Sequence, residues 1–198
     1  MKFYCIIYKP FNVLCQFTAE AGKQCLKDFF DVPVDVYPVG RLDYDSEGLL
    51  ILTNDKKLNQ QLLHPSFEHT RTYYVQVDGS INDKAIHQLQ NGIAIYTGGK
   101  MYHTKKTIAS VFTTPPVVPD RNPPIRLRKI IPTSWIKLVL TEGKNRQVRK
   151  MTAAAGFPTL RLIRYAIEKC TIDGLQPGQM RILTKNETDQ LLFLKHNI

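Results

Sequence analysis

The sequence has no long hydrophobic run. Its 198 residues include no uninterrupted apolar stretch near the roughly 20 residues that a transmembrane helix needs. The first residues lead straight into a short strand-like segment, residues 3–8, which has neither the length nor the small-residue cleavage site of a secretory signal. We therefore expect a cytoplasmic protein with no membrane partner.

Cysteine and histidine are too scattered for a recognisable metal site. The four cysteines, Cys5, Cys15, Cys25 and Cys170, contain no C-x-x-C pair. The five histidines form no H-E-x-x-H or similar pair. The sequence therefore predicts reduced, structural thiols and no zinc site.

Acidic residues are outnumbered by basic ones. Lysine and arginine total 27 against 17 aspartates and glutamates, which gives a net charge of +10. An excess of this size favours a polyanion over a membrane surface as the partner. Hydrophobic residues make up 43% of the chain, enough for one core or for one core with two lobes. We expect a single catalytic domain over residues 1–198, as one body or as two lobes around an active-site cleft.

Strand-like and helical patterns alternate irregularly, which indicates an α+β fold rather than a regular βαβ array. Expected strands cover residues 3–8, 13–17, 49–52, 71–77, 93–112, 135–140, 159–172 and 180–183. Expected helices cover residues 20–30, the segment after Asn54-Asp55, the segment from Asn82 to Gln90, residues 145–156 and a terminal segment capped by Asn186.

The segment GRLDYDSEGLLILTND, residues 40–55, places three carboxylates before a pure aliphatic run. Asp43, Asp45 and Glu47 are expected on a loop held by a buried strand, an arrangement that often carries an active site. The alternating acids also imitate the first half of an EF-hand loop, but Asn54 stands where that loop needs a glutamate. A magnesium-dependent nuclease built on the same acids is a further alternative.

A second segment, EGKNRQVRKM at residues 142–151, combines a basic turn with a helical pattern. From about Asn145 the spacing directs Val148, Met151, Thr152 and Ala155 toward the core. Arg146, Arg149 and Lys150 then lie off that face, where a guanidinium can reach a loop or a phosphate. An ordinary solvated basic face is the alternative.

Residues 113–132 contain six prolines and four basic residues, among them Arg126 and Arg128. A long proline-rich loop inside a compact domain is usually functional or disordered. The charge favours an arm that faces RNA, and a solvated linker is the alternative.

These blocks occur in a recognisable series: Lys9-Pro10, residues 40–55, Arg71-Thr72-Tyr73, residues 142–151, LRLIR at 160–164 and LQPGQMRIL from Leu175. The series resembles the family of small-subunit-type rRNA pseudouridine synthases over nearly the whole chain, and most closely its members that modify the large-subunit 23S rRNA. Many members carry a glycine where Phe11-Asn12 stands here, and another where Glu168 stands. Many also have a separate N-terminal RNA-binding domain, which we expect to be absent.

The resemblance implies a mixed, mostly antiparallel central sheet flanked by helices, and an enzyme that isomerises a stem-loop uridine without any cofactor or metal. A monomer is the default expectation, because the sequence shows no oligomerisation surface. It makes Asp43 the nucleophile, Tyr73 the active-site tyrosine and Arg149 the basic partner of Asp43. A neighbouring guanidinium favours the ionised carboxylate, and a tyrosine ring can stack on uracil. The expected RNA contacts are Arg41, Lys144, Arg146, Gln147, Lys150, Arg126 and Arg128. A non-catalytic RNA-binding protein is the alternative, although binding alone would not require the three catalytic residues together.

Overall fold

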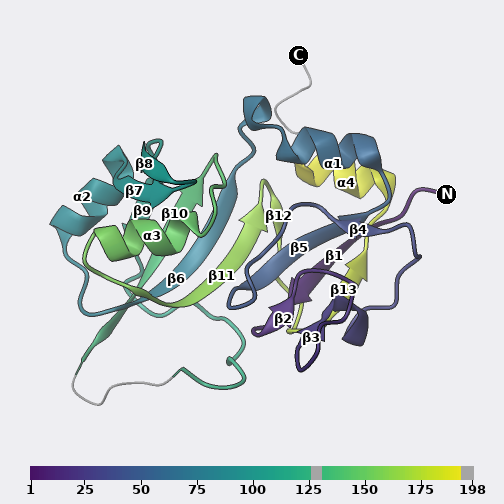
Figure 1. The fold of residues 1–198 in the computed structure, drawn as a ribbon, viewed down its shortest axis with the longest axis horizontal. Coiled ribbons are helices and arrows are strands. Elements are labelled where there is room, and N and C mark those ends of the chain that lie inside the picture. Colours follow the sequence, from purple (N-terminus) through teal and green to yellow (C-terminus); the bar gives the residue numbers. More distant parts are fainter. Residues whose placement is uncertain (126–130, 193–198) are drawn as a thin grey trace. The chain divides into compact units, whose positions relative to one another are not determined.

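The computed structural model describes residues 1–125 and 131–192, and the chain forms two compact units (Figure 1). The first unit combines Met1–His69 with Arg164–Ile198, and the second is Thr70–Ile163. Strand β11 (Thr159–Ile167) begins in the second unit and ends in the first. The single-domain assignment remains a prediction.

The first unit is built on strands β1 (Tyr4–Lys9) and β5 (Glu47–Thr53), which pair antiparallel from Tyr4↔Thr53 to Lys9↔Gly48. Every residue of both strands is buried, as their nearly continuous apolar sequences predict. Strand β13 (Met180–Ile182) pairs with β1, and the short β4 (Tyr37–Pro38) pairs with the end of β5. Strands β2 (Val13–Leu14) and β3 (Gln24–Cys25) form a small parallel pair.

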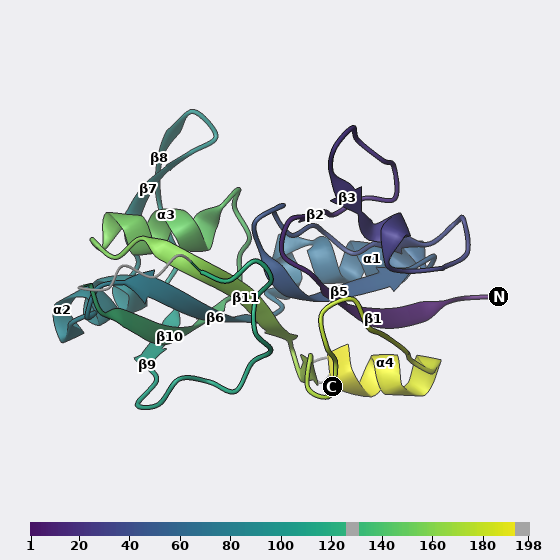
Figure 2. The ribbon, with the colours of Figure 1, turned by 90° about the horizontal axis from the view of Figure 1, so that it is seen from below.

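The second unit is built on strands β6 (Arg71–Asp78) and β10 (Thr133–Leu140), which pair antiparallel along their full length. Strand β9 (Ile108–Val111) pairs with β10, while β7 (Ala94–Thr97) and β8 (Lys100–His103) form a hairpin that turns at Gly98-Gly99, within the strand region expected at 93–112. Helix α3 (Gln147–Ala154) covers one face of β6 and β10 (Figure 2). The shared core joins Val75, Ile136, Leu138, Val148 and Met151.

Side-chain caps set the ends of the predicted helices. Asp55 accepts the backbone N–H groups of Lys57 and Leu58 at the start of α1 (Lys56–Leu63). Asn82 caps α2 (Asp83–Asn91), and Gly92 ends it at φ 92°. The last helix, α4 (Lys185–Leu192), was predicted to be capped by Asn186, but the cap is Thr184, whose hydroxyl accepts the Glu187 N–H at 3.1 Å.

Three expected elements are wrong in type or length. Residues 20–30 form no α-helix but contain β3 and a single 3₁₀ turn, Leu26–Asp28, because Gly22 adopts φ 74° and the Asp28 carboxylate binds the Cys25 N–H at 2.7 Å. The strand expected at 13–17 shrinks to β2. The strand expected at 159–172 splits into β11 and β12 (Cys170–Thr171), because Glu168 takes a left-handed conformation at φ 51°.

The antiparallel pairs within both units and the four helices confirm the expected α+β class. Across the described ranges, 1–125 and 131–192, no helix has both the length and the apolar character needed to cross a membrane.

Candidate active site

Asp43 lies on a short turn that its neighbours anchor in the first unit. The Ser46 N–H donates to the Asp43 carbonyl at 3.0 Å and closes the turn just before β5. Leu42, Ser46 and Glu47 are buried, whereas Asp43 is half-buried and Arg41 is exposed. The sequence therefore folds so that buried residues on both sides hold one partly accessible carboxylate.

The fully buried ammonium group of Lys9 lies near this turn. Its Nζ donates to the carbonyl oxygens of Val13 at 2.7 Å, Pro10 at 2.8 Å and Tyr44 at 3.5 Å. Burial lowers the pKa of Lys9 to about 8, although Cys15 and the carboxylates of the turn act in the opposite direction. Sequence reasoning assigned this residue no function of its own; the available signal was a lysine ending an otherwise apolar strand.

A second buried cation, Arg164, packs against the start of β5. Its Nε donates to the Leu49 carbonyl at 2.8 Å, and its backbone lies so close to Gly48 that a Cβ there would be 2.4 Å from the Arg164 carbonyl oxygen. Only glycine fits at this position. The Leu42 N–H donates to Cys15 Sγ at 3.4 Å; burial raises the pKa of Cys15, whereas that bond and the nearby guanidinium of Arg164 act to lower it.

Tyr73 lies on β6 in the second unit, half-buried against the core of that unit and opposite Leu138 of β10. Tyr74 points to the other face of the strand, as alternation predicts, where its ring meets Phe112 edge-on at 4.9 Å. The rings of Tyr73, the candidate catalytic tyrosine, and Tyr74, which packs on Phe112, therefore lie on opposite faces of β6.

Helix α3 presents Arg149 and Lys150 half-buried, while Val148, Met151 and Thr152 are buried as the spacing predicts. The helix begins after Arg146, which adopts a left-handed conformation at φ 51°. The Arg149 carbonyl accepts the Thr152 hydroxyl at 3.2 Å.

Glu142 fixes the loop before α3, a role that the sequence did not reveal. Its carboxylate accepts the Tyr102 hydroxyl at 2.6 Å, the Lys105 N–H at 2.9 Å and Gln147 Nε2 at 2.6 Å. Gln147 is buried, and its Oε1 accepts the Lys144 N–H at 2.8 Å, so its amide is engaged inside the protein. Lys144 Nζ lies 4.9 Å from the Tyr102 ring centroid and remains at the surface.

The predicted site residues divide between the two units. Arg41 and Asp43 belong to the first, and the second carries Tyr73, Lys144, Arg146, Gln147, Arg149 and Lys150. Arg126 and Arg128 lie outside the described residues. Within the described ranges, no group of three or more histidines, cysteines and acidic residues is placed to hold a metal ion.

The fold is that of a pseudouridylate synthase. A solved structure described as a pseudouridylate synthase matches with a TM-score of 0.78 over 97% of this chain and 74% of its own, at 24% identity. A structure of human RNA pseudouridylate synthase domain containing 1 matches with a TM-score of 0.55 over 91% of this chain and 78% of its own, at 14% identity.

The chain belongs to the RNA pseudouridylate synthase family, whose model matches residues 3–154. It is 44% identical to ribosomal large subunit pseudouridine synthase E of Vibrio parahaemolyticus, over 89% of this chain and 71% of the relative. It is 43% identical to the protein of the same name from Xanthomonas axonopodis, over 87% of this chain and 89% of the relative. Family membership favours the synthase over the binding-only and nuclease alternatives.

Proposed function

We propose that this protein isomerises one uridine of the large-subunit rRNA to pseudouridine, with Asp43 as the nucleophile. The reaction breaks the bond between N1 and C1′, turns the uracil and joins C5 to C1′. The proton leaves C5 and N1 gains one, so the atoms balance without an oxidant, a reductant or ATP. The observation that carries the proposal is the half-buried carboxylate of Asp43. It lies on an anchored turn within residues 3–154, the range that matches the family model.

Two residues of the second unit complete the proposed machinery. Arg149, a permanent cation, would keep the carboxylate of Asp43 ionised while charge changes at the sugar. Tyr73 would stack on the uracil, and its hydroxyl would be in position to move a proton. The target uridine must leave its base stack to reach Asp43, which costs a few kcal/mol that phosphate contacts must offset.

The surface cations of the second unit support an RNA substrate. Lys144 and Arg146 are exposed on the loop that Glu142 fixes, so their charges are presented from an ordered backbone. The proposed substrate is a stem-loop of the large-subunit rRNA, bound by a monomer in the cytoplasm.

The test is tritium release from rRNA that carries tritium at uracil C5. Wild type should release tritium from large-subunit rRNA, and Asp43→Asn should reduce release by at least about a thousandfold, because the amide cannot act as a nucleophile. Release at the wild-type rate by Asp43→Asn would disprove the role of Asp43. No release by wild type from either subunit RNA would disprove the proposed function.

Matched variants separate the roles of the other two residues. Tyr73→Phe keeps the ring and removes the hydroxyl, so an unchanged rate would limit Tyr73 to stacking. Arg149→Lys keeps the charge and Arg149→Gln removes it, so a loss confined to the glutamine variant would assign Arg149 an electrostatic role.

A further inference from the structure

A cavity of about 370 Å³ lies in the first unit, at the end of β5 farthest from the Asp43 turn. The seven residues of β5 separate the two places by roughly 20 Å, at about 3.3 Å per residue. The walls come from the segment around β4, the end of β5 and the first turns of α1. The lining residues are Asp35, Tyr37, Thr53, Asn54, Asp55, Lys56 and Asn59.

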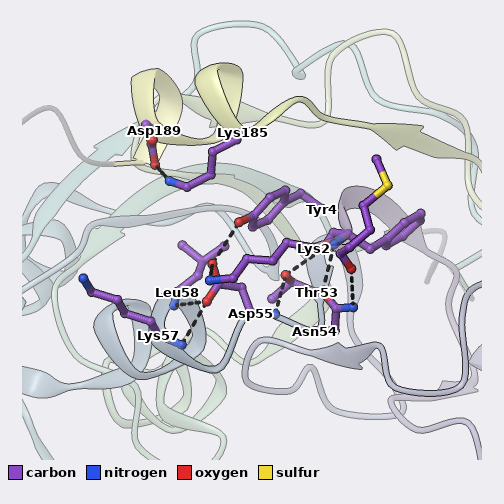
Figure 3. A network of polar contacts seen from close by, with 11 residues as sticks. Lys2, Tyr4, Thr53, Asn54, Asp55, Lys57, Leu58, Lys185 and Asp189 are labelled. Atoms are coloured by element: carbon purple, nitrogen blue, oxygen red, sulfur yellow. Dashed lines mark hydrogen bonds and ion pairs between the residues drawn. The ribbon is translucent and has the colours of Figure 1, made fainter.

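Three of the lining residues form hydrogen bonds or ion pairs that fix the walls of the cavity (Figure 3). Asp55 accepts the Tyr4 hydroxyl and Lys2 Nζ, both at 2.8 Å, besides capping α1. Thr53 donates to the Phe3 carbonyl at 2.6 Å, and Asn54 accepts the Phe3 N–H at 2.8 Å. These bonds make the cavity a preformed feature.

Three more of the lining residues, Asp35, Tyr37 and Asn59, have binding capacity that the described residues leave unused. Tyr37 is 61% exposed, so its ring offers a stacking surface. Asp35 is exposed, and one of its carboxylate oxygens accepts Asn54 Nδ2 at 2.9 Å while the other has no partner in residues 1–125 and 131–192. Asn59 Oδ1 is buried and also lacks a partner there, which costs about 1–3 kcal/mol until a donor arrives.

These unused groups define the chemistry of a ligand. An aromatic ring selects a flat partner, and two acceptors select one with several N–H donors along an edge. Guanine presents N1–H and N2–H₂ side by side. One of these donors would bind the partner-free oxygen of Asp35, and the other would share the Asp35 oxygen that accepts Asn54 Nδ2, because a carboxylate oxygen has two lone pairs. Rotation of the Asn59 amide would direct its oxygen toward the same ligand. Lys56, exposed at the rim, supplies a cation for a phosphate.

We propose that this cavity binds an unpaired guanine of the RNA substrate, at a distance from the target uridine. The inference rests on the proposed function, because it assumes that the chain engages RNA. A base held at this site would select substrates in which an unpaired guanine accompanies the target at the matching separation. Single-stranded bases are the usual objects of sequence-specific RNA recognition.

Binding of free nucleotides tests the cavity without RNA and without catalysis. GMP should shift the backbone amide resonances of residues 35–37 and 53–59 in the full-length protein, and should bind at least about tenfold more tightly than AMP or UMP. Asp35→Asn should weaken GMP binding about tenfold, because the amide presents a donor toward N1–H. Asn59→Leu should also weaken it. Asp31→Asn is the matched control: it removes an exposed carboxylate of the same segment outside the cavity, and should leave GMP binding unchanged.

Catalysis on two substrates then tests the link to RNA. Asp35→Asn should raise KM for a long rRNA fragment about tenfold with kcat unchanged, and should leave both constants unchanged on a minimal target stem-loop. Equal GMP binding by Asp35→Asn and Asp31→Asn would overturn the proposal, as would equal KM values on the long fragment. Binding of argininamide in place of GMP would also overturn it and would assign the cavity to a protein side chain. Because wild-type tritium release is measured separately, failure of this inference leaves the proposed function standing.

Discussion

Lys9 shows at the scale of one residue how the fold lowers the pKa of a buried side chain. Its ammonium has exchanged water for backbone carbonyls, and burial lowers its pKa from 10.5 to about 8. The unfolded chain therefore binds more protons than the folded chain between those pH values, and Lys9 makes stability rise as pH increases through that window.

Comparison with Lys9→Met isolates this effect. The free energy of unfolding of wild type minus that of Lys9→Met should rise by up to about 3 kcal/mol between pH of about 8 and 10.5, measured by urea denaturation. Burial raises the pKa of the Cys5 and Cys170 thiols, which lowers stability at high pH in both proteins. Subtracting the free energy of unfolding of Lys9→Met from that of wild type removes this shared effect. Parallel pH profiles for the two proteins would contradict the prediction.

Two residues at the departures that the resemblance indicated adopt the backbone conformation that glycine favours. Asn12, of the Phe11-Asn12 pair, has φ 56° and Glu168 has φ 51°. Asparagine tolerates this region, and Glu168 Oε1 lies 3.2 Å from Nδ1 of the buried His69. The resemblance located these departures, but their backbone angles depend on the surrounding fold and could not be derived from the residue types.

At the scale of elements, Asp55 connects the end of β5, the start of α1 and the N-terminal segment. Burial acts to raise the pKa of Asp55, but the bonds from Lys2 and Tyr4 lower it from 3.8 to about 2. A carboxyl whose pKa is lowered by folding stabilises the protein above its unfolded pKa, and this stability is lost as pH falls through the folded pKa.

Asp55→Asn should therefore lower the free energy of unfolding by about 2 kcal/mol near neutral pH, and this loss should shrink as pH falls from about 4 to 2. Urea denaturation of both proteins at several pH values measures it. Tyr4→Phe is the matched control, because it removes one donor and leaves the cap of α1 intact, so its cost should be smaller. A loss of stability in Asp55→Asn that did not change with pH would contradict the lowered pKa of Asp55.

Elements defined by local signals were predictable, and elements defined by tertiary contacts were not. Asp55, Asn82 and Gly92 mark helix ends by their own chemistry, so α1 and α2 followed from the sequence. The segment from 20 to 30 has helical spacing at Cys25, Leu26 and Phe29. In the structure, however, Leu26 and Phe30 join the core of the first unit from a 3₁₀ helix and the residues after it, and Cys25 is buried on β3. Packing against β1 and β5 overrides periodicity there.

At the scale of the whole molecule, the net charge of +10 sets how RNA binding depends on salt. Replacing Arg126 and Arg128 together by alanine should weaken binding and reduce the slope of log affinity against log salt by about 2, since each phosphate contact contributes about one. Filter binding at several salt concentrations measures this slope. A control with Lys27→Ala and Lys169→Ala removes the same charge from exposed positions of the first unit and should change the slope less. Equal slopes for wild type and the arginine variant would contradict an RNA-facing arm.

The assignment of Asp43, Tyr73 and Arg149 as the candidate site rests on the resemblance and remains a prediction. The hydrophobic spacing of α3 explains why Val148 and Met151, not Arg149, are buried. The Tyr44 carbonyl near Lys9 and the Tyr102 and Lys105 donors to Glu142 come from residues distant in sequence. No local pattern records such contacts.

The discontinuity of the first unit has a consequence for protein synthesis. A ribosome makes Thr70–Ile163, the whole second unit, before it makes the second half of the first. Gly48 meets the backbone of Arg164, and β1 obtains its partner β13 only when Met180–Ile182 has been made. Because domains tend to fold as units during translation, we expect the second unit to fold first, reversing the usual N-to-C order. The nascent chain then carries Asp43, the proposed nucleophile, on a segment that has not assembled, so we expect it to modify RNA only after the later residues emerge.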